Sequence, residues 1–307
     1  MISFEPTIPV QFRQVVQKLL AAAKADGKTK LIVDLAANGG GLIFQGYDTF
    51  RQLFPQIVQD GNTRFRDTPE FMALSQVISG AFPPGFDPYT SNNDDLINLW
   101  ETPNNYRYDI NIENKPFSSY DEKFAPHQYN GDNFTSIIRW NFNDTLITSE
   151  LPVSPQYFAT NTLLVNKTYG VGEYITGYGP RTNFTQPFAA EDIVMLYDGY
   201  CASTCTIFSE FMRLQGGVKS IAYGGRPSAD SSTPIIQAVG GVKGTNNYAY
   251  GYIVSLAKAA LGFNITAAQK SLLKPLANNL PVQRTTGERL CLRCTLTLEL
   301  IRGRYLS

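Results

Sequence analysis

Apolar residues near the start of the chain recur with the spacing of one face of an α-helix. They stand at i, i+3, i+4, i+7, i+8 and i+11, namely at Phe12, Val15, Val16, Leu19, Leu20 and Ala23. Gly27 is expected to end this helix. The continuous apolar run over 31–35 that follows is typical of a strand buried on both faces. A glycine-rich turn at 38–41 then leads into a second helix over 47–57, which Pro55 shortens or kinks.

The same alternation returns late in the chain. A buried strand is predicted over 193–197, a turn over 198–205 and a helix over 207–212. A further strand over 218–223 and a further helix over 253–261 follow. Buried strands that alternate with amphipathic helices predict an α/β layer fold with parallel strands.

The middle of the chain looks different. Residues 61–190 are rich in Asn, Pro, Asp, Tyr and Phe, they show no sustained periodicity, and they are too many for a loop inside a compact domain. We therefore expect a large, irregular, β-rich insertion there, within a core made of 1–60 and 191–265. Residues 266–307 are expected to form a C-terminal extension, in which the alternation at 295–300 is typical of a half-buried strand.

The composition excludes several classes of function. The 26 basic and 26 acidic residues leave a net charge of zero, which argues against binding to nucleic acid or to an anionic membrane. No uncharged apolar run reaches about 18 residues, so no transmembrane helix is expected. His127 is the single histidine, which excludes a multi-histidine metal site within one chain. We expect neither a metal nor a cofactor.

The composition also suggests passage through the secretory pathway. Charged residues make up only 17% of the chain, and N-glycosylation sequons occur at Asn133, Asn143, Asn166, Asn183 and Asn264. We therefore expect a secretory or extracellular glycoprotein. Residues 1–6, however, have neither a basic nor an apolar region, so we do not expect them to be a signal peptide. Either the protein is cytosolic with a misleading composition, or the chain lacks its natural N-terminus.

The first candidate for chemistry is the glycine-rich turn Asn38-Gly39-Gly40-Gly41, which follows a predicted strand. In open α/β sheets the functional crevice lies at the carboxyl ends of the strands. Three glycines expose backbone N–H groups, which favours an anion or a developing oxyanion. The alternative is a helix-initiating turn that only needs positive φ angles. The spacing fits neither nucleotide-binding glycine motif.

The second candidate is the turn from Asp198 to Cys205, which places Ser203 between a predicted strand and a predicted helix. Ser203 there is either an ordinary helix N-cap or a nucleophile on a strand-to-helix elbow. In the second case the Thr204 N–H would stabilise a tetrahedral intermediate, and the glycine turn would supply the second donor.

These blocks resemble a known family. The stretch 31–41, Leu-Ile-Val-Asp-Leu-Ala-Ala-Asn-Gly-Gly-Gly, is similar to a block of the tail-specific (C-terminal-processing) serine peptidases, and 198–205 is similar to the block that holds their catalytic serine. Residues 117–135, 224–227 and 240–244 are similar to the fungal branch related to the chlamydial secreted protease. The resemblance covers about residues 1–270.

The resemblance implies a fold, an activity and a site. The fold is α/β with a crotonase-like (ClpP/crotonase) core of stacked ββα units. The activity is hydrolysis of peptide bonds by Ser203, with Thr204 and either Gly40 or Gly41 lining the oxyanion hole. Fungal relatives occur in secretion and in clusters that mature ribosomal peptide toxins, which implies precursor-peptide processing.

The general base departs from the family pattern. Bacterial members use a lysine at the spacing where this chain has Ser228, and the chlamydial-like branch uses a histidine ahead of the core. The only histidine, His127, falls in the insertion, where a solvated surface residue is the simpler interpretation. A serine without a base is a poor nucleophile. We therefore expect an incomplete chain, a half-enzyme whose base comes from a missing N-terminal segment or a partner, or a non-catalytic relative.

The four cysteines have several interpretations. Cys201 and Cys205 flank Ser203, and a disulfide would form either between them or to Cys291 or Cys294, since four cysteines allow three pairings. A catalytic cysteine lacks a nearby histidine. The Cys291/Cys294 pair is a single CxxC without two further zinc ligands, so an incidental thiol pair is the simpler reading.

Three functions follow from these observations. The first is a serine endopeptidase that acts on exposed polypeptide segments. The second is a catalytically inactive peptide-binding relative that lacks the base. The third is a crotonase-like acyl-transfer enzyme acting on thioesters, which the serine motif disfavours because such enzymes need no serine nucleophile.

Overall fold

The computed structural model describes residues 9–148, 174–223 and 247–278 of the 307-residue chain. These residues form two compact units. The first unit comprises 9–60, 147–148 and 174–223, and the second comprises 61–146 and 247–278. The helix α6 (Thr145–Thr148) lies at the boundary between them.

The first unit is built on a parallel sheet with the strand order β1-β6-β7. The strands are β1 (Leu31–Asp34), β6 (Ile193–Tyr197) and β7 (Lys219–Ala222). The pairing is in register, with Leu31 opposite Ile193 and Val194 opposite Lys219. The predicted parallel strands are thereby confirmed.

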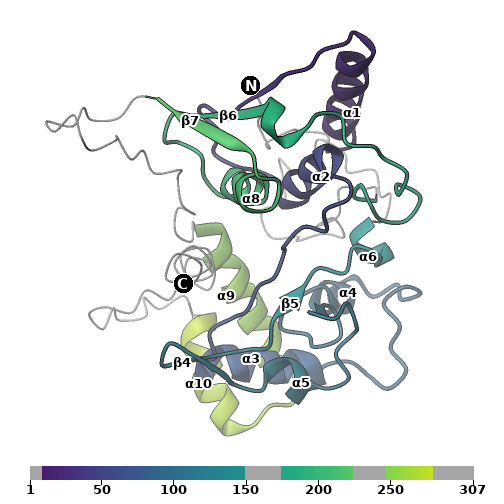
Figure 1. Ribbon diagram of the computed structural model, residues 1–307. Helices are drawn as coiled ribbons and strands as arrows, with labels where there is room; N and C mark the ends of the chain where they lie inside the picture. The colour runs from purple at the N-terminus through teal and green to yellow at the C-terminus, as the bar shows by residue number, and fades with distance from the viewer. Residues whose placement is uncertain (1–8, 149–173, 224–246, 279–307) are drawn as a thin grey trace, which may run out of the picture. The chain divides into compact units, whose positions relative to one another are not determined.

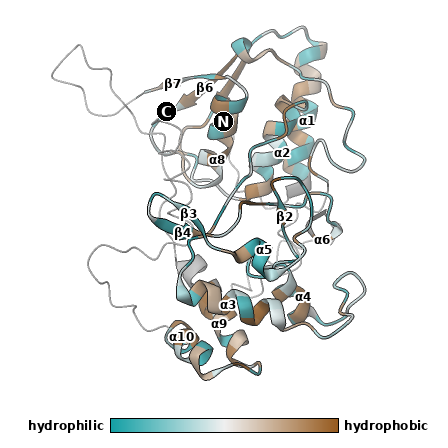
Figure 2. Ribbon diagram, turned by 60° about the horizontal axis from the view of Figure 1, so that its bottom comes forward, coloured by the Kyte–Doolittle hydropathy of each residue, from teal (hydrophilic) through white to brown (hydrophobic). Residues whose placement is uncertain are grey.

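Helices cover one face of this sheet. The helix α2 (Ile43–Leu53) packs beside α8 (Thr204–Glu210), and α1 (Pro9–Ala25) packs on α2 (Figure 1). The predicted helix therefore exists and carries both hydrophobic and hydrophilic residues (Figure 2). Its predicted apolar face is only partly buried, since Val16 and Leu20 are buried but Val15 and Leu19 are exposed. A 3-10 turn, η1 (Ala190–Asp192), precedes β6, and a π-helical turn, η2 (Phe211–Gln215), extends α8.

Burial along the strands shows that only one face of the sheet is closed within the described residues. On β6, Ile193, Met195 and Tyr197 are buried, whereas the residues between them are half-buried. Ile32 on β1 is 66% exposed and Ile221 on β7 is 57% exposed. The expectation of a strand buried on both faces is therefore wrong for β1, because α2 and α8 both pack on the same face of the sheet.

The second unit is mainly helical. Its helices are α3 (Pro69–Gly80), α4 (Asp94–Trp100), α5 (Tyr120–Phe124), α9 (Asn247–Leu261) and α10 (Ala267–Ala277). Two small antiparallel sheets join β2 (Ile110–Asn111) to β5 (Ile138–Arg139) and β3 (His127–Tyr129) to β4 (Asp132–Phe134). The expected β-rich character is thus wrong for the described part of 61–190, since α3, α4 and α5 lie there.

The α3 helix carries a start signal of its own. Thr68 has extended backbone angles and its hydroxyl accepts from the Phe71 N–H, with Pro69 at the first helical position. The core beneath α3 is formed with α4, α9 and α10 by Ala73, Leu74, Val77, Ile78, Leu99, Leu256, Ala257, Ala260, Leu273, Leu276 and Ala277. The predicted helix over 253–261 therefore exists, but it packs in the second unit.

Residues 174–190 belong to the first unit, whereas the sequence pattern predicted that they form one insertion with 61–173. The cause is Asp48 on α2, which is 2% exposed. Its carboxylate accepts hydrogen bonds from the N–H and the hydroxyl of Thr176, both at 2.8 Å, and from Gln52 Nε2 at 2.7 Å. A buried carboxylate needs such donors, so Thr176 is held on α2.

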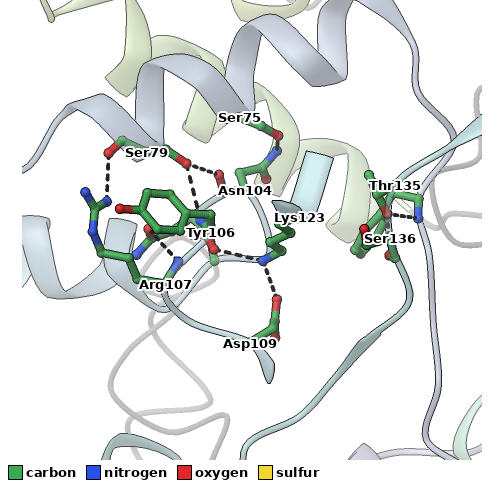
Figure 3. A network of polar contacts seen from close by, with 12 residues as sticks. Ser75, Ser79, Asn104, Tyr106, Arg107, Asp109, Lys123, Thr135 and Ser136 are labelled. Carbon is green, nitrogen blue, oxygen red and sulfur yellow. Dashed lines mark hydrogen bonds and ion pairs between the residues drawn. The ribbon is translucent and has the colours of Figure 1, made fainter. Parts of the chain in front are cut away.

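A buried ion pair holds the loops of the second unit together (Figure 3). Lys123 is fully buried, and its Nζ lies 2.7 Å from Asp109 Oδ2 and 2.8 Å from the Asn105 carbonyl oxygen. Burial lowers the pKa of Lys123 and raises the pKa of Asp109, while their mutual attraction opposes both shifts. The pair therefore depends on both partners being present.

We expect Lys123→Met to lower the free energy of unfolding by about 3–5 kcal/mol, because it leaves the Asp109 carboxyl buried without its cation. Urea denaturation measures this change. The control is Lys115→Met, since Lys115 pairs with Glu113 at 2.9 Å on the surface, where both side chains are more than 60% exposed. Equal effects of the two substitutions would contradict the role given to Lys123.

Candidate active site

Ser203 stands at the end of the loop between β6 and α8 with an unusual backbone conformation. Its φ is +53° and its ψ is −122°, and its side chain makes no capping hydrogen bond. Thr68, Asn93, Ser119 and Thr266, whose side chains do cap helices among the described residues, all have negative φ angles and accept a bond from the helix. The structure therefore contradicts the N-cap interpretation of Ser203.

A positive φ in a residue with a side chain costs about 1–3 kcal/mol and persists only where the surroundings enforce it. One enforcing feature is a disulfide between Cys201 and Cys205, whose Cα atoms lie 5.4 Å apart on either side of Ser203. Both cysteines are completely buried. This pairing decides among the alternatives that the sequence left open, whereas Cys291 and Cys294 lie outside the described residues.

The glycine-rich turn lies directly against Ser203. Because β1 and β6 are adjacent and parallel, their carboxyl ends lie at the same edge of the sheet. Gly40 has a φ of +102°, and a Cβ atom there would lie 2.6 Å from the Ser203 Cβ and 2.9 Å from the Thr204 nitrogen. Only glycine fits at such a distance. The structure thus brings together the two turns that the sequence singled out.

Three hydrogen bonds join the two turns. The Ala202 N–H donates to the Asn38 carbonyl oxygen at 3.1 Å, and the Thr204 hydroxyl donates to the Gly41 carbonyl oxygen at 2.7 Å. The Ala37 N–H donates to Asp198 Oδ2 at 2.8 Å. These bonds fix the backbone of the glycine turn relative to Ser203.

Two side chains in this arrangement were not anticipated from the sequence. Asn38 is 1% exposed, and its Oδ1 accepts the Gly40 N–H at 2.9 Å. Asp198 accepts the Tyr200 N–H through Oδ1 at 2.9 Å, in addition to its bond from Ala37. The available signal was their position, since Asp198 directly follows β6 and Asn38 lies four residues after the end of β1, and polar residues just beyond such strands lie at the functional edge of a parallel sheet.

Thr204 is held from a second side as well. It is completely buried, and a Cβ atom on Gly46 of α2 would lie 2.7 Å from its Cγ2. As the first residue of α8, Thr204 has an N–H with no partner inside the helix. This geometry leaves a fixed backbone donor beside the hydroxyl-bearing residue Ser203.

The sequence decides to which family this arrangement belongs. The model of the family described as Peptidase family S41 matches residues 1–232. The chain belongs to peptidase family S41. The resemblance inferred from the motifs is therefore confirmed.

Curated relatives of the S41 chain come from fungi. The Peptidase S41 family protein ustP of Aspergillus flavus is 33% identical over 241 residues, which cover 77% of this chain and 43% of the relative. The Peptidase S41 family protein phomP1' of Diaporthe leptostromiformis is 30% identical over 277 residues, which cover 87% and 36%. The chain thus spans about two fifths of the length of these relatives. No solved structure matches it.

Acidic groups surround the carboxyl ends of the strands in the S41 chain. Partial burial, and then the negative charges of Asp34 and Asp198, raise the pKa of the Tyr223 hydroxyl. The Tyr223 N–H donates to the Tyr197 carbonyl oxygen at 2.9 Å, which places this residue beyond β7 at the same edge. The raised pKa favours the uncharged form of the Tyr223 hydroxyl.

His127 lies in the second unit of the S41 chain, at the start of β3. Its Nε2 lies 2.9 Å from the Ser136 hydroxyl oxygen, and that hydroxyl donates to the Glu122 carbonyl oxygen at 2.6 Å. Because the Ser136 proton is already used, Nε2 carries the proton of this pair and acts as the donor. The exposed histidine has a structural partner.

We expect His127→Ala to leave peptide turnover unchanged, because the imidazole Nε2 is engaged with Ser136 in the β3–β4 region. Steady-state kinetics on a cleaved peptide measure this. The companion variant Ser136→Ala removes the same hydrogen bond and should behave alike. A large loss of kcat in His127→Ala alone would identify the histidine as the missing base.

No described helix is both long and apolar enough to cross a bilayer.

Proposed function

We propose that this chain is the catalytic part of a serine endopeptidase, with Ser203 as the nucleophile on a crotonase-like core. The observation that carries the proposal is the forced conformation of Ser203, with φ at +53° and with Gly40 packed against its Cβ. A serine held on a strained strand-to-helix turn exposes its hydroxyl instead of capping the helix. Its half-buried side chain agrees with that role.

In the proposed reaction the Ser203 hydroxyl attacks a peptide carbonyl carbon, and a base takes its proton. The oxyanion accepts hydrogen bonds from the backbone N–H groups of Thr204 and Gly41. Gly41 is preferred to Gly40 because the Gly40 N–H already donates to Asn38 Oδ1. The amine leaves with a proton, and water then hydrolyses the acyl-enzyme ester.

The proposed base comes from outside the described part of the first unit. The chain's single histidine belongs to the second unit, and its Nε2 is engaged with Ser136. We therefore assign the base to another segment of the polypeptide or to a partner. The basic role can be filled by histidine or lysine.

The proposed substrate is an exposed polypeptide segment, and maturation of a secreted or ribosomally made precursor peptide is the proposed process. Membership of the S41 family supports a peptide substrate. The fungal origin of the curated relatives supports a fungal process.

The test is incubation of the disulfide-bonded chain with a mixed peptide library, followed by mass spectrometry of the products. The proposal expects internal cleavage that yields new amino and carboxyl termini. Retention of peptides without any cleavage would instead identify a peptide-binding relative. Hydrolysis confined to thioesters would identify an acyl-transfer enzyme.

A further inference from the structure

A cleft of about 480 Å³ lies beside α1 in the first unit. Its lining comes from α1, from α2 and from the segment that precedes η1, and consists of Gln17, Leu20, Ala21, Lys24, Ala25, Gln52, Asn183, Phe184, Thr185 and Pro187. None of these residues belongs to the two turns at Ser203. The cleft is therefore a feature that the proposed peptidase reaction does not use.

The wall of the cleft contains a complete N-glycosylation sequon. Asn183, Phe184 and Thr185 all line it, and both Asn183 and Thr185 are exposed. The residue between them is not proline, as the sequon requires. The acceptor amide thus stands at the cleft with its recognition residue accessible.

The sequon segment is held in place by Arg181. The guanidinium carbon of Arg181 lies 4.8 Å from the centre of the Phe184 ring. The same group donates to Gln17 Oε1 on α1 at 3.2 Å and to the Thr176 hydroxyl at 2.8 Å. The cleft is therefore formed before any ligand arrives.

We propose that Asn183 carries an N-linked glycan and that the first N-acetylglucosamine of this glycan occupies the cleft. A sugar of this kind presents apolar C–H faces together with hydroxyl and N-acetyl groups. The cleft lining offers partners for both kinds of group. Leu20, Phe184 and Pro187 can pack against the apolar faces, and Gln17 and Gln52 can hydrogen-bond the polar groups.

Gln52 offers a specific partner for the sugar. Its side chain is 3% exposed, and its Nε2 donates to Asp48 Oδ2 and to the Arg13 carbonyl oxygen. Its Oε1 is buried and has no hydrogen-bond partner among the described residues. A buried acceptor without a donor is costly. Because Gln52 lines the cleft, a small rotation of its amide toward the cleft would let a sugar hydroxyl or the N-acetyl N–H satisfy it.

The disulfide of the first unit supports the compartment that this modification needs. Cys201–Cys205 is a bond typical of oxidising compartments such as the endoplasmic reticulum, which is also where N-glycosylation takes place. The other described sequons, at Asn133, Asn143 and Asn264, have exposed asparagines as well. Asn183 differs from them because its sequon lines this cleft.

The modification is a balanced group transfer from a lipid-linked oligosaccharide pyrophosphate. The side-chain nitrogen of Asn183 forms a bond to C1 of the first sugar, and the bond from C1 to the pyrophosphate oxygen breaks. The amide loses one proton, and the lipid pyrophosphate leaves with the bonding electrons. No oxidant or reductant takes part.

The first measurement is occupancy. The full chain, fused to an endoplasmic reticulum signal sequence, is translated with microsomes, and glycans are counted as endoglycosidase-sensitive mobility steps. Asn183→Gln and Thr185→Ala are each expected to remove one step, as is the control Asn143→Gln. An unmodified Asn183 in chains whose other sites are occupied would overturn the proposal.

The second measurement tests whether the sugar occupies the cleft. In chain secreted from yeast, Asn183→Gln is expected to lower the midpoint of thermal unfolding by about 3 °C relative to Asn143→Gln. Trimming the wild-type glycans to a single N-acetylglucosamine should leave the midpoint unchanged. Equal midpoints for the two variants would show that the sugar lies outside the cleft, which overturns the proposal.

Discussion

Replacing Ser203 with alanine is expected to abolish peptide cleavage, with a loss of kcat on the order of 10⁶-fold, the size found when other serine peptidases lose their nucleophile. The reason is that the acyl-enzyme cannot form without the hydroxyl oxygen. Fold and disulfide should survive, because the Ser203 side chain makes no capping hydrogen bond that the helix would lose. Steady-state kinetics and thermal unfolding of the same preparation measure both effects.

Ser119→Ala is the matched control for Ser203→Ala. Ser119 also precedes a helix, but its φ is −153° and its hydroxyl accepts the Glu122 N–H at 3.1 Å. We therefore expect Ser119→Ala to cost about 1 kcal/mol of stability without any effect on turnover. The opposite pattern, in which Ser203→Ala destabilises the fold and leaves cleavage intact, would restore the N-cap interpretation and refute the nucleophile.

Gly40→Ala is the second substitution expected to have a large effect, on both activity and stability. A Cβ at residue 40 would lie 2.6 Å from the Ser203 Cβ and 2.7 Å from the Ala202 carbonyl oxygen, at a φ of +102° that alanine rarely adopts. The backbone must shift, which displaces the turn from Ser203. We expect a loss of kcat of at least about 10²-fold, the size of one lost oxyanion donor, together with a lower thermal midpoint.

The control for Gly40→Ala is Gly80→Ala. Gly80 ends α3, and a Cβ there would meet no atom within 4 Å. Alanine is the better helix former, so this change should raise stability by about 0.5–1 kcal/mol. Wild-type turnover in Gly40→Ala would show that the close approach to Ser203 has no catalytic importance.

The elements that carry the site could be predicted because their local patterns are strong. The spacing of the apolar residues of α1 and the continuous apolar runs of β1 and β6 indicated an α/β layer, and the two turns followed from their positions after strands. The position of Ser203 was therefore predictable. Its φ was not, since that angle depends on the contact with Gly40, far away in the sequence, and on the Cys201–Cys205 pairing, which the sequence left open among alternatives.

The unit boundaries depend on side chains far apart in the sequence. Thr176 belongs to the first unit because the carboxylate of Asp48, buried on α2, accepts hydrogen bonds from its N–H and its hydroxyl. Ala257 on α9 joins the second unit because its helix packs against α3 and α10. Thr68 and Pro69 are a helix-start signal that the sequence contains. It was not used, because the range 61–190 as a whole is rich in Asn and Tyr and shows no sustained periodicity.

The most direct measurement of the central claim is the mass-spectrometric mapping of a fluorophosphonate adduct on the disulfide-bonded chain. A serine reacts with this probe only when its hydroxyl is activated. The account predicts a single phosphonylated peptide that contains residues 201–205 joined by their disulfide, with the added mass on Ser203. An adduct on another serine, or an unmodified Ser203 in a preparation that cleaves peptides, would contradict it.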